Sequence, residues 1–218
     1  MNKIWVFGDS FSEPYEKQGD TLSEFVKWKG YATKSYYDYI AEEFNFDTKI
    51  FAKGGSSNRT ILSQFISNVD SIDSNDIIII GWSSINRFRI LKNNEFFDFV
   101  PTFTEKEISP IEELSIECLY QVAINRVKND FFYSELLEYM KLIKKLFPNN
   151  ITIFWTWCGI DNPNKISDEY KESLTFFDGL NEQEKIIEET GGLIKDHHYS
   201  ENGHKELSKI FLSKLKLI

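Results

Sequence analysis

A serine follows the first apolar run of the chain, and it is the first residue whose type and position suggest chemistry. Residues 3–7, Lys-Ile-Trp-Val-Phe, are predicted to form a buried strand that ends at Gly8. Gly8 allows the backbone to turn tightly, so Ser10 is expected on a strand-to-loop turn. A serine hydroxyl is a weak nucleophile, and it needs a base within hydrogen-bond reach.

The candidate base lies near the other end of the chain, in a loop that contains His197 and His198. An imidazole suits the role because its pKa lies near neutral pH. Asp196 precedes the two histidines and could orient the ring of His198. Ser10, His198 and Asp196 together would provide the nucleophile, base and acid of an acyl-transfer reaction.

Acyl transfer also needs hydrogen-bond donors for the negative charge that develops on the attacked carbonyl oxygen. Gly54-Gly55 follows a second predicted strand, and Ser83 and Asn86 follow a third. Backbone N–H groups near Ser10 and Gly55 are candidate donors, with a side chain from the third strand end. One such donor is typically worth about 3–4 kcal/mol of barrier.

Two charged residues near these positions have more than one interpretation. Asp9 either orients the turn before Ser10 or is an ordinary turn residue. Arg87 either anchors an anionic substrate or is a structural ion-pair partner, and we favour the ion pair. The aromatic side chains of Trp82 and Phe88 are interpreted as core or pocket wall.

The rest of the chain predicts the frame that must position these residues, because strand-like and helix-like segments alternate along it. The predicted strands are 3–7, 48–52, 76–82 and 151–157, and the predicted helices are 31–44, 58–69, much of 111–147, 183–189 and 201–215. Asn58 is the predicted cap of the helix that runs to about Val69. This alternation predicts a three-layer α/β fold, a flavodoxin-like parallel sheet of about five strands with helices on both faces. In such sheets, ligands bind beyond the carboxyl ends of the strands, where the candidate residues lie.

Length and composition predict one domain over residues 1–218, with an aromatic and acidic insertion at 88–110 as a possible lid. The net charge of −9 argues against nucleic acid as a partner, because phosphate contacts need clustered basic residues. No signal peptide or membrane span is recognised, so we expect a cytoplasmic protein. Cys118 and Cys158 are expected to be reduced. The oligomeric state stays open.

The sequence resembles the SGNH hydrolases, also called GDSL-type esterases, over residues 4–212. Gly8-Asp9-Ser10-Phe11 is similar to the first family block, Gly-Asp-Ser-Leu. Residues 52–58 resemble the second block, with Gly55 the better match to its oxyanion glycine. The last block places Gly-His after the catalytic histidine at the spacing that Gly203-His204 has from His198.

The sequence departs from the family pattern at two positions. The third block is usually Gly-x-Asn-Asp, and Ser83 occupies the place of its oxyanion asparagine. Asn86 is an alternative donor if the loop curls. The family acid usually lies three residues before the histidine, where this chain has Lys195, whereas Asp196 lies two before.

The resemblance implies a serine-dependent hydrolase of carboxylic esters that acts through an acyl-enzyme, without metal or other cofactor. Its substrate would be a small-molecule or glycan ester, with a carbohydrate O-acetyl ester as one possibility. By the same resemblance, Ser10 attacks, His198 takes its proton and Asp196 holds the imidazole.

Three alternatives remain open at this point. A catalytically weak binding protein for carbohydrate or acyl ligands would explain the two departures. An O-acyltransferase would use the same triad, because both reactions share the acyl-enzyme. A metal site built from Asp196, His197, His198 and His204 is a further alternative, which we do not favour because adjacent histidines point in different directions.

Overall fold

A five-stranded parallel sheet forms the centre of the computed structural model, which describes residues 2–14, 26, 32–92, 95–100, 116–128, 131–157, 167–177 and 198–215. Its strands are β1 (Lys3–Gly8), β2 (Asp47–Ala52), β3 (Ile77–Trp82), β6 (Ile151–Thr156) and β7 (Phe176–Phe177). The order across the sheet is β2-β1-β3-β6-β7, and every neighbouring pair is parallel. This is the predicted flavodoxin-like order. The two-residue strand β7 has no periodic signal and was not predicted.

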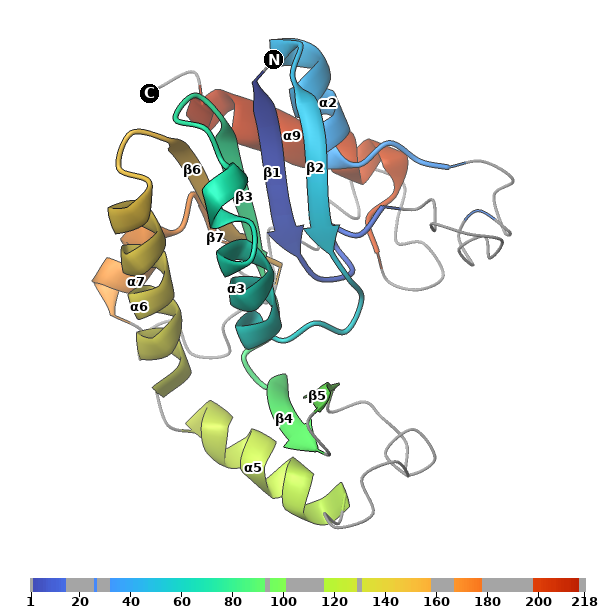
Figure 1. Cartoon of the computed structure of the whole chain (residues 1–218). Helices are drawn as coiled ribbons and strands as arrows, with labels where there is room; N and C mark the ends of the chain where they lie inside the picture. Colours follow the sequence, from blue (N-terminus) through green and yellow to red (C-terminus); the bar gives the residue numbers. More distant parts are fainter. Residues whose placement is uncertain are drawn as a thin grey trace.

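Helices cover both faces of this sheet, as the alternation predicts (Figure 1). The helices of the described ranges are α2 (Tyr36–Phe44), α3 (Asn58–Ile66), the short 3-10 helix η1 (Val69–Ser71), α5 (Ile116–Lys128), α6 (Phe131–Leu146), α7 (Asp168–Ser173) and α9 (Glu201–Leu215). Helices α2 and α9 pack on one face, and α3, α6 and α7 pack on the other. The helix predicted at 183–189 lies outside the described residues.

Strand residues alternate between the two faces, and each set supports its own core. Ile4 and Val6 of β1 pack with α2 and α9, whereas Trp5 and Phe7 pack with α3 and α6. The four consecutive isoleucines of β3 divide in the same way, and every residue of that strand is buried. Burial on both faces is why these strands appear in the sequence as continuous apolar runs.

Two predicted helix starts need correction. The helix predicted from Tyr31 begins at Tyr36, because the Asp38 carboxylate accepts a hydrogen bond from the Ser35 amide at 2.7 Å and caps the helix there. Helix α3 is capped by Ser57, whose side chain accepts from the Thr60 amide, and not by Asn58. Asn58 is the first helical residue, and its side chain serves the candidate site described below.

The segment predicted as an irregular insertion contains an antiparallel hairpin, β4 (Phe88–Lys92) and β5 (Glu95–Phe99). One face of the hairpin carries Phe88 and Phe99, which form a small separate core with Leu119 and Ala123 of α5. Figure 1 shows the hairpin and α5 beyond the arrowheads of β1 and β2, at the carboxyl edge of the sheet. Residues 101–110 of the predicted lid lie outside the described residues.

Candidate active site

Ser10 lies on a tight turn immediately after β1, half-buried at the carboxyl edge of the sheet. The Ser12 amide donates to the Asp9 carbonyl at 3.0 Å and closes this turn. The Ser12 hydroxyl is buried and shares a hydrogen bond of 2.9 Å with the Tyr36 hydroxyl, which ties the turn to α2. The nucleophile candidate is thus held by contacts on both of its sides.

Asp9 is 1% exposed and is the centre of a buried polar network. Its Oδ1 accepts from the Phe11 amide at 3.1 Å, and its Oδ2 accepts from Arg87 Nη1 at 3.0 Å and from Trp157 Nε1 at 2.8 Å. Burial raises the pKa of this carboxyl, while Arg87 and a hydrogen bond from Ser83 oppose the rise. The structural ion pair expected of Arg87 is confirmed.

Ser83, at the place of the family asparagine, is 1% exposed and belongs to the same network. Its hydroxyl accepts from Arg87 Nη1 at 2.8 Å. Its backbone is held by Asn58, whose Oδ1 accepts from the Ser83 amide at 2.7 Å and whose Nδ2 donates to the Ser83 carbonyl at 3.0 Å. Asn86 Oδ1 accepts from the Ser84 hydroxyl at 2.5 Å. The oxyanion role of Ser83 or Asn86 stays a prediction.

The Gly54-Gly55 loop approaches the nucleophile from β2. A Cβ built on Gly54 would lie 3.6 Å from Ser10 Cβ, so this loop passes directly beside the serine. The Gly54 amide donates to Glu13 Oε2 at 2.9 Å and is therefore already occupied. Gly55 has a φ of +81°, a backbone conformation that strongly favours glycine. The oxyanion role of the Gly55 amide stays a prediction.

His198 returns from the late loop to the same edge of the sheet, where its ring lies 4.7 Å from the ring of Phe11, centroid to centroid. Phe11 stacks on its other neighbour, Trp157, at 4.4 Å. Tyr199 meets the Phe11 ring edge-on at 5.5 Å. The residue next to Ser10 therefore lies against the candidate base, although 188 positions separate Ser10 from His198 in the sequence.

His204 lies in the first turns of α9 and is buried, with its ring near Tyr36 and Tyr199. Burial, with a further contribution from His198, lowers the pKa of His204 to about 3.

Asp196 and His197 lie outside the described residues. No cluster of three or more histidine, cysteine or acidic side chains suited to a metal occurs within the described ranges. Cys118 is exposed on α5, and Cys158 lies outside the described residues.

Several contacts of this site have no signal in the sequence. The sequence pattern places Trp157 at the end of a predicted buried strand, yet its indole N–H donates a hydrogen bond to Asp9. Asn58 reads as a helix cap, yet its carboxamide binds the Ser83 backbone. An ion pair was expected for Arg87, but its additional hydrogen bond to Ser83 was not. That bond depends on the conformation of the loop after β3.

No protein-family model matches the sequence, and no curated protein matches it either. Solved structures do match over nearly the whole chain. A member of the lipolytic protein G-D-S-L family from Veillonella parvula has a TM-score of 0.51 at 10% identity, covering 100% of both chains. An extracellular lipase from Streptomyces rimosus has a TM-score of 0.51 at 14% identity, covering 98% of this chain and 100% of the lipase.

An α/β hydrolase enzyme from the metagenome of Lake Arreo is similar to the same extent, with a TM-score of 0.51 at 13% identity over 99% of this chain and 95% of that enzyme. Within the described ranges, no helix combines the length and the apolar character that a membrane crossing requires. The expected α/β fold and the resemblance noted from the sequence are confirmed together at the level of the fold: this chain has the fold of the GDSL lipolytic proteins.

Proposed function

We propose that this protein is a serine-dependent hydrolase of carboxylic esters, with Ser10 as nucleophile and His198 as general base. The observation that carries the proposal is the contact between Phe11 and His198, at 4.7 Å between ring centroids. It brings the first and last motifs of the sequence together at the carboxyl edge of a parallel sheet, where such folds bind their ligands.

In the proposed reaction, the Ser10 hydroxyl attacks the ester carbonyl while His198 takes its proton. The tetrahedral intermediate collapses, the alcohol leaves with the proton returned by His198, and water then hydrolyses the acyl-enzyme by the same steps. Asp196 is proposed to orient the imidazole. The amide of Gly55, which follows Gly54 in the loop that passes the serine, is proposed as one donor to the developing oxyanion.

The Asp9–Arg87 pair is proposed to keep the serine turn in place without contacting the substrate. The Asp9 carboxylate holds the Phe11 amide, and the same carboxylate binds Arg87 and Trp157. Arg87 in turn binds Ser83, so the ends of β1 and β3 are linked through one guanidinium. A fixed nucleophile and fixed donors are what lower the barrier of such a reaction.

The direct test is hydrolysis of p-nitrophenyl acetate by the purified protein, by Ser10→Ala and by His198→Ala. Both variants should lose turnover by a factor of about 10³ or more. Circular dichroism should show that they remain folded, because Ser10 is half-buried and His198 is not fully buried. Turnover that survives in folded Ser10→Ala would refute the proposed nucleophile.

A second candidate is a binding protein for carbohydrate or acyl ligands on the same fold. It is favoured by the engagement of the Ser83 hydroxyl with Arg87, at the place where the family has its oxyanion asparagine. This candidate predicts ligand binding without turnover in the unmodified protein. An O-acyltransferase would instead form more transfer product than hydrolysis product when a sugar or alcohol acceptor is added.

A further inference from the structure

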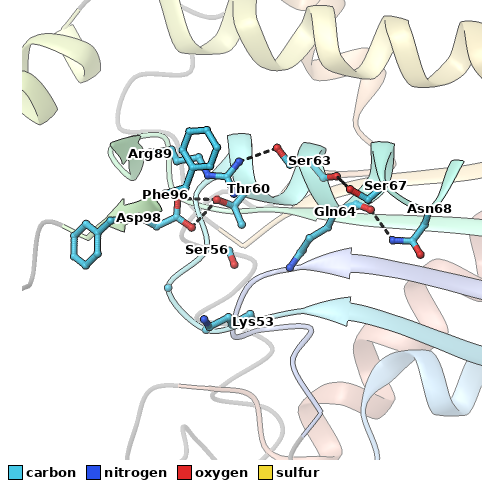
Figure 2. Close-up of a pocket in the computed structure, with 13 residues that line it drawn as sticks. Lys53, Ser56, Thr60, Ser63, Gln64, Ser67, Asn68, Arg89, Phe96 and Asp98 are labelled. Carbon is cyan, nitrogen blue, oxygen red and sulfur yellow. Dashed lines mark hydrogen bonds between the residues drawn. The ribbon is translucent and has the colours of Figure 1, made fainter. Parts of the chain in front are cut away.

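A pocket of about 590 Å³ lies beside the candidate active site, and the Gly54-Gly55 loop is the part of its lining that the reaction proposed above also uses. Its walls are the Gly54-Gly55 loop, the outer side of α3 and the face of the β4–β5 hairpin that carries Arg89 and Asp98. Figure 2 shows these side chains around the pocket, with Lys53 on the opposite side from Arg89. Because a Cβ on Gly54 would lie 3.6 Å from Ser10 Cβ, one loop separates the pocket from the nucleophile.

Three buried polar atoms in the wall have no hydrogen-bond partner within the described part of the chain. They are Ser56 Oγ, Gln64 Oε1 and Arg89 Nε. Ser56 is 2% exposed, so its hydroxyl is removed from solvent. A buried polar group without a partner typically costs about 1–3 kcal/mol, and such groups in native structures call for an explanation. Their gathering at one pocket indicates a polar occupant.

The wall formed by the end of α3 and the turn at Ser67 and Asn68 presents hydrogen-bond acceptors. The Ser67 hydroxyl donates to the Ser63 carbonyl at 2.9 Å, so its oxygen is left to accept. Asn68 Nδ2 donates to the Gln64 carbonyl at 2.8 Å, which leaves the Asn68 Oδ1 to accept. Gln64 Oε1 adds a third acceptor. Acceptors spaced along the end of α3 and the turn after it suit a ligand with several hydroxyl groups.

The charge of the pocket is positive, although the whole chain carries −9. Lys53 and Arg89 are cations, and Lys53 makes no ion pair with any described residue. Asp98 is the acidic residue of the lining, and its carboxylate accepts from the Ser57 hydroxyl at 2.6 Å and from Thr60 Oγ1 at 2.7 and 2.6 Å. With its oxygens so occupied, Asp98 is a poor partner for the two cations, which favours an anion on the ligand.

We propose that this pocket binds an acidic sugar unit of the substrate, with its hydroxyl groups against α3 and its carboxylate attracted by Lys53 and Arg89. This inference rests on the proposed esterase function, because the bound sugar would carry the ester to Ser10. It assigns the substrate class as an esterified acidic glycan. The pocket contributes affinity and specificity and takes no part in bond cleavage.

The test is calorimetric binding to the Ser10→Ala protein, which cannot consume an ester at that serine. The probes are trigalacturonate and a glucuronate-substituted xylo-oligosaccharide, each compared with its neutral methyl-ester form. We expect at least one acidic probe to bind about five- to tenfold more tightly than its neutral form, and the preference to shrink as salt is raised. Equal affinity for acidic and neutral forms of both probes, or no binding of any, would overturn the proposal.

The residue-level test uses Lys53→Met and Arg89→Lys in the same Ser10→Ala background. Lys53→Met should lose most of the preference for the acidic probe, while Arg89→Lys keeps the charge and should retain it in part. Lys205→Met, at an exposed position on α9, removes a charge of the same kind away from the pocket and is the matched control. A preference unchanged in Lys53→Met, or lost equally in Lys205→Met, would refute the assignment.

The two proposals fail separately. Charge-selective binding by a protein that never hydrolyses p-nitrophenyl acetate would retain the sugar pocket and reject the esterase. Hydrolysis that depends on Ser10, combined with charge-independent binding, would retain the esterase and reject the pocket.

Discussion

At the scale of single residues, the Asp9–Arg87 pair differs from most ion pairs among the described residues because it is buried. The Asp9 side chain is 1% exposed and that of Arg87 is 13% exposed, whereas other pairs, such as Lys141–Glu169, lie at the surface. Surface pairs contribute little to stability, but a buried charge that loses its partner is strongly destabilising. Asp9 and Arg87 are therefore expected to be strongly coupled in their contribution to stability. Their effect on activity is expected to come from the position of Ser10.

A double-mutant cycle tests this coupling. Arg87→Met should destabilise the fold by about 3–5 kcal/mol, because it leaves the Asp9 carboxylate buried without its cation. Asp9→Asn should cost less, since the amide can still accept a hydrogen bond from Arg87. The cycle between them, measured by urea unfolding, should give a coupling energy of about 1–3 kcal/mol. Additive effects would contradict the buried network.

The activity of these variants separates positioning from chemistry. Arg87→Met and Asp9→Asn should both lower kcat for p-nitrophenyl acetate and change KM much less. They displace the serine turn but do not remove a substrate contact. Arg87→Lys should restore part of the activity by restoring the charge, although one ammonium cannot reproduce the guanidinium geometry at Asp9 and Ser83. An Arg87→Lys variant as inactive as Arg87→Met, and equally stable, would mean that charge is irrelevant there.

The sequence suggests candidate residues for the site, whose roles stay predictions, but it does not reveal their contacts. Ser10, Gly55 and His198 are recognisable because residue type and strand ends carry the signal, and the fold brings Phe11 against His198. The bonds from Trp157 to Asp9 and from Asn58 to Ser83 could not be predicted. Each bond joins segments that are far apart in the chain, and a single sequence does not show which distant residues meet in the fold.

At the scale of elements, Asn58 connects helix α3 to the end of strand β3. Its carboxamide makes two hydrogen bonds with the backbone of Ser83, at 2.7 and 3.0 Å, as a neighbouring strand would. The strand end at Ser83 is buried, so water cannot replace these bonds. The junction therefore fixes the loop that carries both Ser83 and Arg87.

Replacing Asn58 tests this junction. Asn58→Ala should destabilise the protein by about 1–3 kcal/mol, because the buried Ser83 N–H and C=O lose their partners. Asn58→Asp keeps an acceptor for the amide and should restore part of the stability. Thermal unfolding gives the stability, and hydrogen exchange at 83–87 should increase in Asn58→Ala. Unchanged exchange there would show that α3 does not hold this loop.

The predicted elements are most accurate where burial leaves a simple pattern in the sequence, either an apolar run or a helical stripe. The isoleucine run of β3 and the helix 201–215 agree closely with the structure. The β4–β5 hairpin was missed because its alternation is obscured. Phe88, Ile90, Phe97 and Phe99 alternate toward α5, but Leu91 and Phe96 add apolar residues to the opposite face and are 59% and 63% exposed.

At the scale of the whole molecule, a buried histidine makes the free energy of unfolding depend on pH. His204 packs in the core between α2 and α9, with Tyr36 and Tyr199 as ring neighbours. Burial lowers its pKa to about 3, whereas an unfolded chain would titrate it near 6.5. Between these pH values the unfolded state binds a proton that the folded state does not.

The sign of the effect follows from this difference in bound protons. Stability rises with pH wherever the unfolded state binds more protons, so the His204 contribution is complete above about pH 6.5 and is lost as the pH falls toward 3. At about 1.4 kcal/mol per pH unit, acidification from pH 7 to pH 5 should remove about 2 kcal/mol from the free energy of unfolding. His204→Phe should abolish that part of the loss, because a phenyl ring fills a similar volume without titrating.

The measurement is urea unfolding of the unmodified protein, His204→Phe and Tyr199→Phe at pH 7 and pH 5. Tyr199→Phe alters the same aromatic cluster but removes no imidazole, so its stability difference from the unmodified protein should be the same at both pH values. His204→Phe should instead gain about 2 kcal/mol relative to the unmodified protein on going from pH 7 to pH 5. If the two variants respond alike to acid, His204 is not the group that couples protonation to unfolding.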